Sequence, residues 1–334
     1  MKKQLSLIVL LAFSLSLFSQ VSFTLKSNTT YTDNAFQLSE DDIDVHDSGD
    51  SKFDYIETRD DMIHNLGASL IYRNKIKSLK YSLTAKGGYN GYLKNSDKSK
   101  YTAGVGFGLD TKKLDIGFFA GYYPDNYVRK YQDKDGTQEY EKFEYDKNLF
   151  KLDGEFRLSR KSYLLAYVKY EDYYHNQYFT EYDAEALTTG LGFKYSLSEL
   201  YLQAWYYYRV YETVDNITAE DAVSDASYES NIYKAQLRFK KIKCKKIGYR
   251  PVFDLSYEKR YFDGYDKYHS GREDDMFKFS PSVKFYLSSF FNLTLDYTLQ
   301  YRTVTSDNQS VEDSKSYTEN QYSLAFEIPL KINF

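Results

Sequence analysis

The chain has 334 residues, including 38 Tyr and 23 Phe, with a formal net charge of −4 and a mean hydropathy of −0.64. This aromatic content excludes a disordered polar chain. The lack of any long apolar run beyond residue 20 excludes helical membrane spans. The single cysteine, Cys244, excludes an intrachain disulfide, and the lysines on either side of it indicate a turn.

Residues 1–19 have the three parts of a secretory signal peptide. Two lysines precede an apolar run from Leu5 to Phe18, and Ser19–Gln20 provides a small-residue cleavage point. The run is short for a membrane-spanning helix, which needs about 20 residues. We therefore expect residues 1–19 to be removed on export and residues 20–334 to form the mature domain.

From residue 21 onward, apolar and polar residues alternate in fourteen segments. Because successive side chains of a strand point to opposite faces, each segment predicts a strand with one apolar face. The expected strands span 21–32, 62–73, 78–91, 101–110, 113–124, 147–159, 162–173, 186–196, 199–211, 229–241, 249–262, 276–287, 290–302 and 319–334. The low hydropathy fits strands in a membrane, since only one face of each must be apolar.

The links between these segments alternate in length. Short turns such as Asp110–Lys113 and Ser159–Ser162 follow the even-numbered strands, although the link through Lys243 to Gly248 is somewhat longer. Long charged links follow the odd-numbered strands, at 33–61, 92–100, 125–146, 174–185, 212–228, 263–275 and 303–318. The pattern predicts an all-β fold, a single closed antiparallel transmembrane β-barrel with short periplasmic turns and long extracellular loops. Fourteen strands are expected, with 12 or 16 as alternatives.

The last segment has apolar residues at every second position and ends on an aromatic residue. These residues are Tyr322, Leu324, Phe326, Ile328, Leu330, Ile332 and Phe334. The segment resembles the carboxyl-terminal signature of bacterial outer-membrane β-barrel proteins, and no motif narrows the resemblance to a subfamily. The resemblance implies a place in the outer membrane of a Gram-negative cell, with Phe334 as the insertion signal. The implied partners are the barrel-insertion machinery, outer-membrane lipid and lipopolysaccharide.

If the apolar faces contact lipid, the alternating side chains line the lumen. The predicted lumen-lining charged residues are Lys80, Lys86, Lys151, Arg157, Lys169, Lys194, Arg209, Lys234, Arg238, Arg260, Lys278, Lys284 and Arg302, together with Asp115, Asp153, Glu155, Glu171, Asp254, Glu258, Asp296 and Glu327. Thirteen basic against eight acidic residues make a net positive wall. Charges in such a wall must be paired or hydrated. Because about eight strands leave a filled barrel and 16–18 leave a channel, we expect a narrow, partly filled pore.

The long link at 33–61 contains an acidic run from Glu40 to Asp50. The simpler interpretation is a solvated surface loop, and a divalent-cation site is the alternative. No Cys/His metal cluster, phosphate loop or nucleic-acid module occurs in the sequence, so we expect no cofactor, no metal and no nucleic-acid partner.

Neither of two catalytic arrangements found in outer-membrane enzymes is complete in this sequence. Phospholipases of this class place a His and a Ser two residues apart on an outward face, but here His64 is followed at that distance by Leu66. Omptin-type proteases set paired acids opposite an Asp-x-His, whereas Asp42, Asp44 and His46 fall within one predicted loop. The sequence therefore predicts a protein that is not an enzyme.

The predicted function is a porin-like channel for small hydrophilic solutes, with a weak preference for anions. Two alternatives remain open. One is a non-conducting surface barrel that binds a partner or supports the envelope. The other is a protein-export barrel resembling the membrane domain of surface-lipoprotein assembly factors.

Overall fold

The computed structural model describes residues 20–133, 136–213, 225–244, 247–288 and 291–333. The predicted signal peptide and the terminal residue Phe334 lie outside these ranges. Among the described residues, none of the helices has the length and hydropathy needed to cross a bilayer.

Most of the described chain is β-strand. The strands are β1 (Gln20–Thr32), β2 (Asp61–Ile76), β3 (Leu79–Tyr92), β4 (Lys100–Asp110), β5 (Leu114–Gln132), β6 (Tyr140–Arg157), β7 (Ser162–His175), β8 (Ala184–Ser196), β9 (Leu200–Thr213), β10 (Tyr228–Phe239), β11 (Ile242–Cys244), β12 (Ile247–Phe262), β13 (Glu273–Tyr286), β14 (Asn292–Thr305) and β15 (Tyr317–Asn333). Short helices lie between them: α2 (Glu40–Asp47), α3 (Gln309–Lys315), and the 3-10 turns η2 (Ser51–Phe53), η3 (Ser96–Lys98) and η4 (Thr180–Tyr182).

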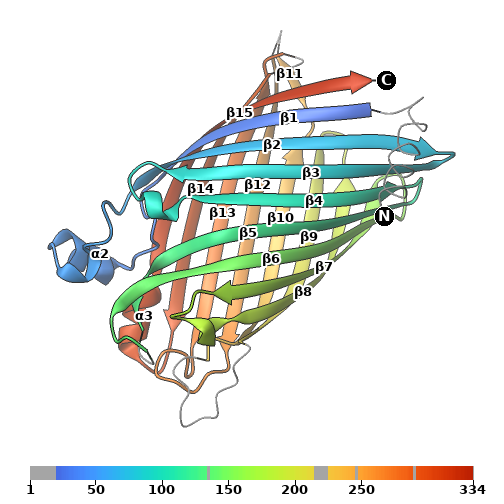
Figure 1. Cartoon of the computed structure of the whole chain (residues 1–334). Coiled ribbons are helices and arrows are strands. Elements are labelled where there is room, and N and C mark those ends of the chain that lie inside the picture. The colour runs from blue at the N-terminus through green and yellow to red at the C-terminus, as the bar shows by residue number, and fades with distance from the viewer. Residues whose placement is uncertain (1–19, 134–135, 214–224, 245–246, 289–290, 334) are drawn as a thin grey trace, which may run out of the picture.

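The strands form one closed antiparallel sheet (Figure 1). Apart from the short β11, each strand pairs with its neighbours along the chain, and β1 pairs with β15 from Gln20↔Asn333 to Thr32↔Gln321. The three residues of β11 pair only with β12, on the edge of β12 that also pairs with β10, so β11 is a short continuation of β10. The prediction of a closed barrel of 14 strands is confirmed.

The two ends of the barrel differ, as the link lengths predict. The start of β1 and the end of β15 lie at one end, and α2 and α3 lie at the other (Figure 1). Tight turns close the first end; for example, the Thr111 amide donates to the Leu114 carbonyl at 2.9 Å. The longer connections with their short helices make up the second end, which we call the loop-side mouth.

Two links are shorter than predicted. The predicted loop 125–146 is largely strand, because β5 extends to Gln132 and β6 begins at Tyr140. Two register shifts, at Tyr123/Asn126 and Tyr127/Arg129, break the period of two and hid this extension from the alternation analysis. The link through Lys243 is likewise taken up mostly by β11 and the start of β12.

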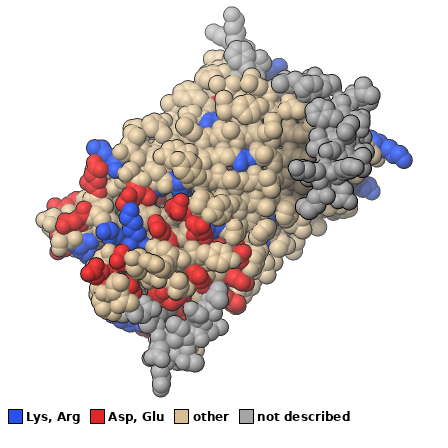
Figure 2. Space-filling model, in the orientation of Figure 1, with Lys and Arg blue, Asp and Glu red and all other residues tan. Residues whose placement is uncertain are grey.

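The outer face of the barrel is apolar. Large apolar side chains are exposed along it; Leu66 is 55% exposed, Val105 59% and Leu191 63%. The wall seen in Figure 2 is nearly free of charge, whereas acidic and basic side chains gather at the loop-side mouth. A contiguous apolar exterior of this kind fits the hydrocarbon core of a membrane.

The predicted solvated loop at 33–61 instead has a small core of its own. Phe36, Leu38, Phe53 and Ile56 pack with Tyr127 of β5, and each is less than 8% exposed. Ser39 caps α2 by accepting from the Asp42 amide at 3.1 Å. Apolar residues that flank the acidic run therefore give this loop a core that was not predicted. The run itself is at the surface as predicted: Glu40, Asp41, Asp44, Asp47 and Asp50 are exposed, and Asp42 is buried.

Candidate functional site

The predicted lumen residues all occupy strand positions opposite the exposed apolar face. On β6, for example, Leu152 is 49% exposed to the outside, and Lys151 and Asp153 on either side of it form an ion pair at 2.8 Å. The same alternation runs through every strand that carries a predicted residue. The structure thus places these side chains together along the inner face of one barrel.

Eight of the thirteen predicted basic residues form an ion pair. The pairs are Lys80–Asp110 at 3.2 Å, Lys151–Asp153 at 2.8 Å, Lys169–Glu171 at 2.6 Å, Lys194–Glu155 at 2.6 Å, Arg209–Glu171 at 3.5 Å, Arg260–Glu258 at 2.8 Å, Lys284–Glu327 at 2.9 Å and Arg302–Asp274 at 2.5 Å. Several join residues two apart on the same strand, so much of the wall charge is neutralised locally.

Five predicted basic residues form no ion pair within the described part of the chain. Four of them lie over aromatic rings: Lys86 over Phe119 at 5.3 Å, Arg157 over Tyr163 at 5.5 Å, Lys234 over Tyr207 at 5.4 Å and Arg238 over Tyr201 at 5.0 Å; Lys278 is the fifth. Three predicted acids, Asp115, Asp254 and Asp296, likewise form no ion pair with described residues. Asp254 accepts from the Gln236 amide at 2.8 Å, and Asp296 from the Thr298 hydroxyl at 3.4 Å.

Several charged residues on the inner face were not predicted from the sequence. They include Lys26, Arg73, Lys75, Lys100, Lys147, Arg250, Asp61, Asp110, Asp274 and Glu319. Most lie near a strand end, some beyond the expected bounds, and the same alternation would have found them had the strands been drawn longer. These ten additions are six basic and four acidic residues, so the wall stays net positive.

The interior holds space at the middle of the barrel and at the end with the short turns. A cavity of about 350 Å³ in the middle is lined by Trp205, Lys234, Asp254 and Lys278. Near the short turns, a cavity of about 320 Å³ is lined by Arg73, Lys80 and Asp110, among others. The inner wall is therefore polar and not packed solid.

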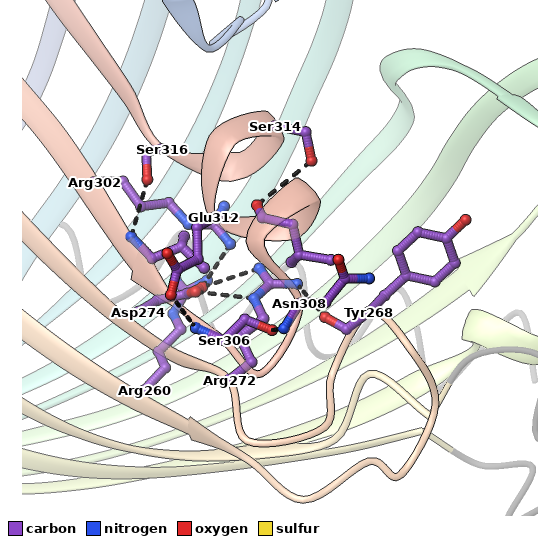
Figure 3. A network of polar contacts seen from close by, with 12 residues as sticks. Arg260, Tyr268, Arg272, Asp274, Arg302, Ser306, Asn308, Glu312, Ser314 and Ser316 are labelled. Atoms are coloured by element: carbon purple, nitrogen blue, oxygen red, sulfur yellow. Dashed lines mark hydrogen bonds and ion pairs between the residues drawn. The ribbon is translucent and has the colours of Figure 1, made fainter. Parts of the chain in front are cut away.

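Two buried carboxylates organise the basic residues at the loop-side mouth. Asp274 is fully buried and accepts from Arg272 at 2.9 and 3.1 Å and from Arg302 at 2.5 Å (Figure 3). Glu171, 2% exposed, is paired with Lys169, with Arg209 and with Lys147 at 3.4 Å. Each carboxylate therefore contacts two or three cationic side chains but carries only one negative charge, so each cluster is net positive.

Helix α3 lies beside the cluster of Asp274, Arg272 and Arg302 (Figure 3). Asn308 caps it by accepting from the Ser310 amide at 3.1 Å, and Glu312 accepts from the Ser306 amide at 2.8 Å (Figure 3). The Ser316 hydroxyl accepts from the Val304 amide at 3.0 Å, which ties the end of the helix to β14. These contacts fix Lys315, the last residue of α3, beside the basic residues of the wall.

The β5–β6 hairpin bends toward α3 at the mouth (Figure 1). Arg129 of β5 pairs with Asp42 of α2 at 3.3 Å, and Asp42 also pairs with Lys52 at 2.9 Å. The Lys315 ammonium lies 5.3 Å from the centre of the Tyr131 ring. The hairpin thus joins the first loop on one side to α3 on the other.

These parts enclose a cavity of about 660 Å³ at the loop-side mouth, which we call the mouth cavity. Thirteen aromatic rings line it, with eight basic side chains against the two carboxylates Asp42 and Glu181. The basic side chains are Lys52, Arg129, Lys130, Arg209, Arg260, Arg272, Arg302 and Lys315. The sequence predicted Arg209, Arg260 and Arg302 as lumen residues but gave no sign that they meet the loop residues.

The residues that resemble parts of known catalytic sites are held in contacts with neighbouring side chains. His64 lies on the outer face of β2 with its Nδ1 2.9 Å from the Thr29 hydroxyl. Asp42 is bound in its two ion pairs, and His46 contacts Asp47 at 3.0 Å. Across the described ranges, no group of three or more His, Cys, Asp and Glu residues is arranged to hold a metal ion.

No protein-family model matches the chain, and none of the curated proteins matches it. Solved structures of outer-membrane proteins resemble it only distantly. OmpT of Vibrio cholerae is 9% identical, with a TM-score of 0.47 over 93% of this chain and 98% of that chain. An anion-selective porin from Comamonas acidovorans is 8% identical, with a TM-score of 0.45 over 93% and 99%. A bacterial polysaccharide outer membrane secretin is 7% identical, with a TM-score of 0.46 over 93% and 98%. Similarity at this level says nothing about what the barrel carries.

The geometry itself defines the class. A closed antiparallel barrel of 14 strands, with an apolar exterior and long loops at one end, is an outer-membrane β-barrel protein. Its place is the bacterial outer membrane, and its subfamily is not identified.

Proposed function

We propose that the protein is a porin-like channel for small hydrophilic solutes with a weak preference for anions. The observation that supports this is the inner wall, which is charged and holds cavities in the middle and at both ends of the barrel. Charged side chains in such a wall are hydrated unless all are paired, and several here have no ion-pair partner among the described residues. Such a channel catalyses no reaction.

The charges without ion-pair partners support the anion preference. Of the predicted residues, five basic ones (Lys86, Arg157, Lys234, Arg238 and Lys278) and three acidic ones (Asp115, Asp254 and Asp296) form no ion pair within the described ranges. Walls of one sign in a narrow space of low dielectric raise the local concentration of counter-ions. Because the imbalance is small, the preference is weak.

Single-channel recording in planar bilayers tests the proposal. The parent protein should conduct in KCl, and its reversal potential under a KCl gradient should show anion preference. Lys234→Glu with Arg238→Glu should move the reversal potential toward cation preference. The control, Lys112→Glu with Lys161→Glu, changes the charge equally in the short turns and should have a smaller effect. A cation-selective parent, or equal effects of the two double variants, would contradict the lumenal charge argument.

A non-conducting barrel is the second candidate. The observation that favours it is the packing of α2, the β5–β6 hairpin and α3 around the loop-side mouth through Arg129, Asp42 and Lys315. Absence of conductance from correctly folded protein would favour this candidate. In either case we propose outer-membrane lipid and lipopolysaccharide as the surroundings of the wall, and the barrel-insertion machinery as a partner during assembly.

A further inference from the structure

We propose that the mouth cavity is a binding site for acidic sugars, that is, for a pyranose ring that carries a carboxylate. This inference rests on the proposed channel function and names the class of solute that the loop-side mouth captures. It is carried by the charge of the cavity, by donor groups that lack partners, and by a row of aromatic rings.

The net positive charge of the cavity lining favours the binding of an anion. Its lining has eight basic and two acidic side chains. Three further carboxylates, Glu171, Glu258 and Asp274, stand behind the lining and still leave an excess of basic groups. Gathering cations in a partly buried space is costly unless a counter-charge accompanies them. A bound anion supplies that counter-charge.

Specific donor groups in the cavity lack partners. The buried Nε atoms of Arg129, Arg209 and Arg302 have no hydrogen-bond acceptor among the described residues. Lys315 forms no ion pair within those residues, and its nearest ring is that of Tyr131, at 5.3 Å. Guanidinium and ammonium groups bind carboxylates through charge-assisted hydrogen bonds. Lys315 can therefore bind the carboxylate of a ligand without first breaking an ion pair among the described residues. Arg129, Arg209 and Arg302, which are already paired with Asp42, Glu171 and Asp274, add positive charge around it.

An aromatic row runs across the wall of the cavity. Tyr145 of β6 lies 5.4 Å from Tyr173 of β7, Tyr173 lies 5.5 Å from Tyr211 of β9, and Tyr211 lies 5.0 Å from Tyr228 of β10 (centroid to centroid). Phe262 of β12 continues the row at 5.2 Å from Tyr228.

Strand β8 makes this continuity possible. It lies between β7 and β9, where Ala184 pairs in register with Tyr173 and Ala186 with Tyr211. Because the alanine side chains are small, the two tyrosine rings contact each other across β8. Both alanines are 1% exposed and lie beneath the rings. A larger residue at either position would interrupt the row.

The row and the basic groups form one surface. The guanidinium carbons of Arg260 and Arg209 lie 4.8 Å and 5.8 Å from the centre of the Tyr228 ring. A tyrosine presents an apolar face and a polar hydroxyl, which matches a pyranose with its C–H face and its hydroxyl rim. The cavity, at about 660 Å³, lies within the usual range of small-molecule sites, about 300–1,000 Å³. It therefore has room for one or two sugar rings.

Titration calorimetry on the detergent-solubilised full barrel at low salt tests the proposal, and it reads binding without requiring conduction. The probes are glucuronate, glucose as the same ring without the charge, and benzoate as a carboxylate on an aromatic ring. Glucuronate should bind about tenfold or more tightly than glucose, and more tightly than benzoate. Equal binding of glucuronate and glucose, tighter binding of benzoate, or no binding of glucuronate would overturn the proposal.

Variants locate the site. Lys315→Gln, which removes a charge that has no ion-pair partner among the described residues, should weaken glucuronate binding about tenfold, and Lys315→Arg should retain it. Tyr145→Leu, at a partly exposed ring of the row, should weaken it about threefold to tenfold through the loss of a ring face. Lys161→Gln, in a short turn at the far end, is the matched control and should bind like the parent. Equal affinities of Lys315→Gln, Tyr145→Leu and the control would overturn the assignment to this cavity.

The two proposals fail separately. A barrel that conducts but does not bind glucuronate retains the channel function and loses this site. A barrel that binds glucuronate but does not conduct retains the site and loses the channel. Heat-modifiable migration in gel electrophoresis checks that each variant is folded before either measurement.

Discussion

At the scale of single residues, Asp274 shows what a buried charge contributes at the loop-side mouth. It is fully buried between Arg272 and Arg302. Because Asp274→Ala leaves two guanidinium groups without their counter-charge, it should lower the free energy of unfolding by about 3–5 kcal/mol. The control, Asp110→Ala, removes an exposed pair with Lys80 and should cost less than about 1 kcal/mol. Urea unfolding in lipid vesicles measures both, and equal losses would contradict the prediction.

Lys98 couples loop packing to pH. Its ammonium donates to the Val128 carbonyl at 3.0 Å and lies 4.4 Å from the Phe36 ring centre. Burial, reinforced by Lys100 and Arg129, lowers the pKa of Lys98 from 10.5 to about 7. Lys98 therefore binds its proton more tightly when the loops are unpacked and the side chain is in water than when the loops are packed and it is buried. Lowering the pH from 10.5 to about 7 should weaken the packing of the first two loops, with no further change below that range.

Hydrogen exchange of residues 33–60, corrected for intrinsic rates, measures this effect. The parent should become more protected as the pH rises from about 7 to 10.5. The Lys98→Met variant, which cannot titrate, should show a flat profile. The same slope in both proteins would assign the pH dependence to another group.

At the scale of elements, the seam between β1 and β15 closes the barrel. Thr30 and Ser323 are direct partners in the register, and their hydroxyl oxygens lie 2.8 Å apart. Directly opposite residues of antiparallel strands have Cα atoms about 4.5–5.5 Å apart, within the range for a disulfide. In a Cys244→Ser background, Thr30→Cys with Ser323→Cys should therefore form an intrachain disulfide on oxidation.

Mass spectrometry of the oxidised protein detects that bond. The control pair, Ser27→Cys with Ser323→Cys, puts the thiols on opposite faces and out of register and should remain reduced. Failure of the Thr30–Ser323 pair to oxidise in folded protein would mean that the seam is not closed as described.

The two faces of a strand should respond differently to charge. Leu70 of β2 is 47% exposed on the apolar outside, and its neighbour Ser69 faces inward, paired in register with Lys86 of β3. Leu70→Arg should cost about 2–4 kcal/mol if it lies near the bilayer midplane. Ser69→Arg should change stability by less than about 0.5 kcal/mol, apart from mild repulsion by Lys86. Folding yields in vesicles compare the two, and similar yields would mean that the faces are assigned wrongly.

At the scale of the whole molecule, selectivity comes from the summed field of the wall. Screening lengths shrink from about 30 Å at 0.01 M salt to about 3 Å at 1 M. The anion preference should therefore be strongest under a KCl gradient at low total salt and should fade under the same ratio at high salt. Reversal potentials measure it, and a preference independent of salt would point to a contact site in place of a diffuse field.

The sequence by itself determined the barrel. Alternation of apolar and polar residues is a local property with a period of two, so it marks strands and faces without knowledge of any partner. The lengths of the links between strands are also read directly from the sequence, and they distinguish the end of the barrel with short turns from the end with long loops. The period of two breaks at the bulges after Tyr123 and Tyr127, so the extended β5–β6 hairpin was not predicted from alternation.

Only the tertiary structure decided how the loop-side mouth is built. Tyr145, Tyr173, Tyr211 and Tyr228 lie on four strands and form a row because the register aligns them and because β8 carries alanines between them. Lys315 reaches the same cavity from a loop helix. Register between strands and the packing of loops depend on contacts between residues far apart in the chain. Those contacts leave no periodic trace in the sequence, so it predicted a charged lumen but not this site.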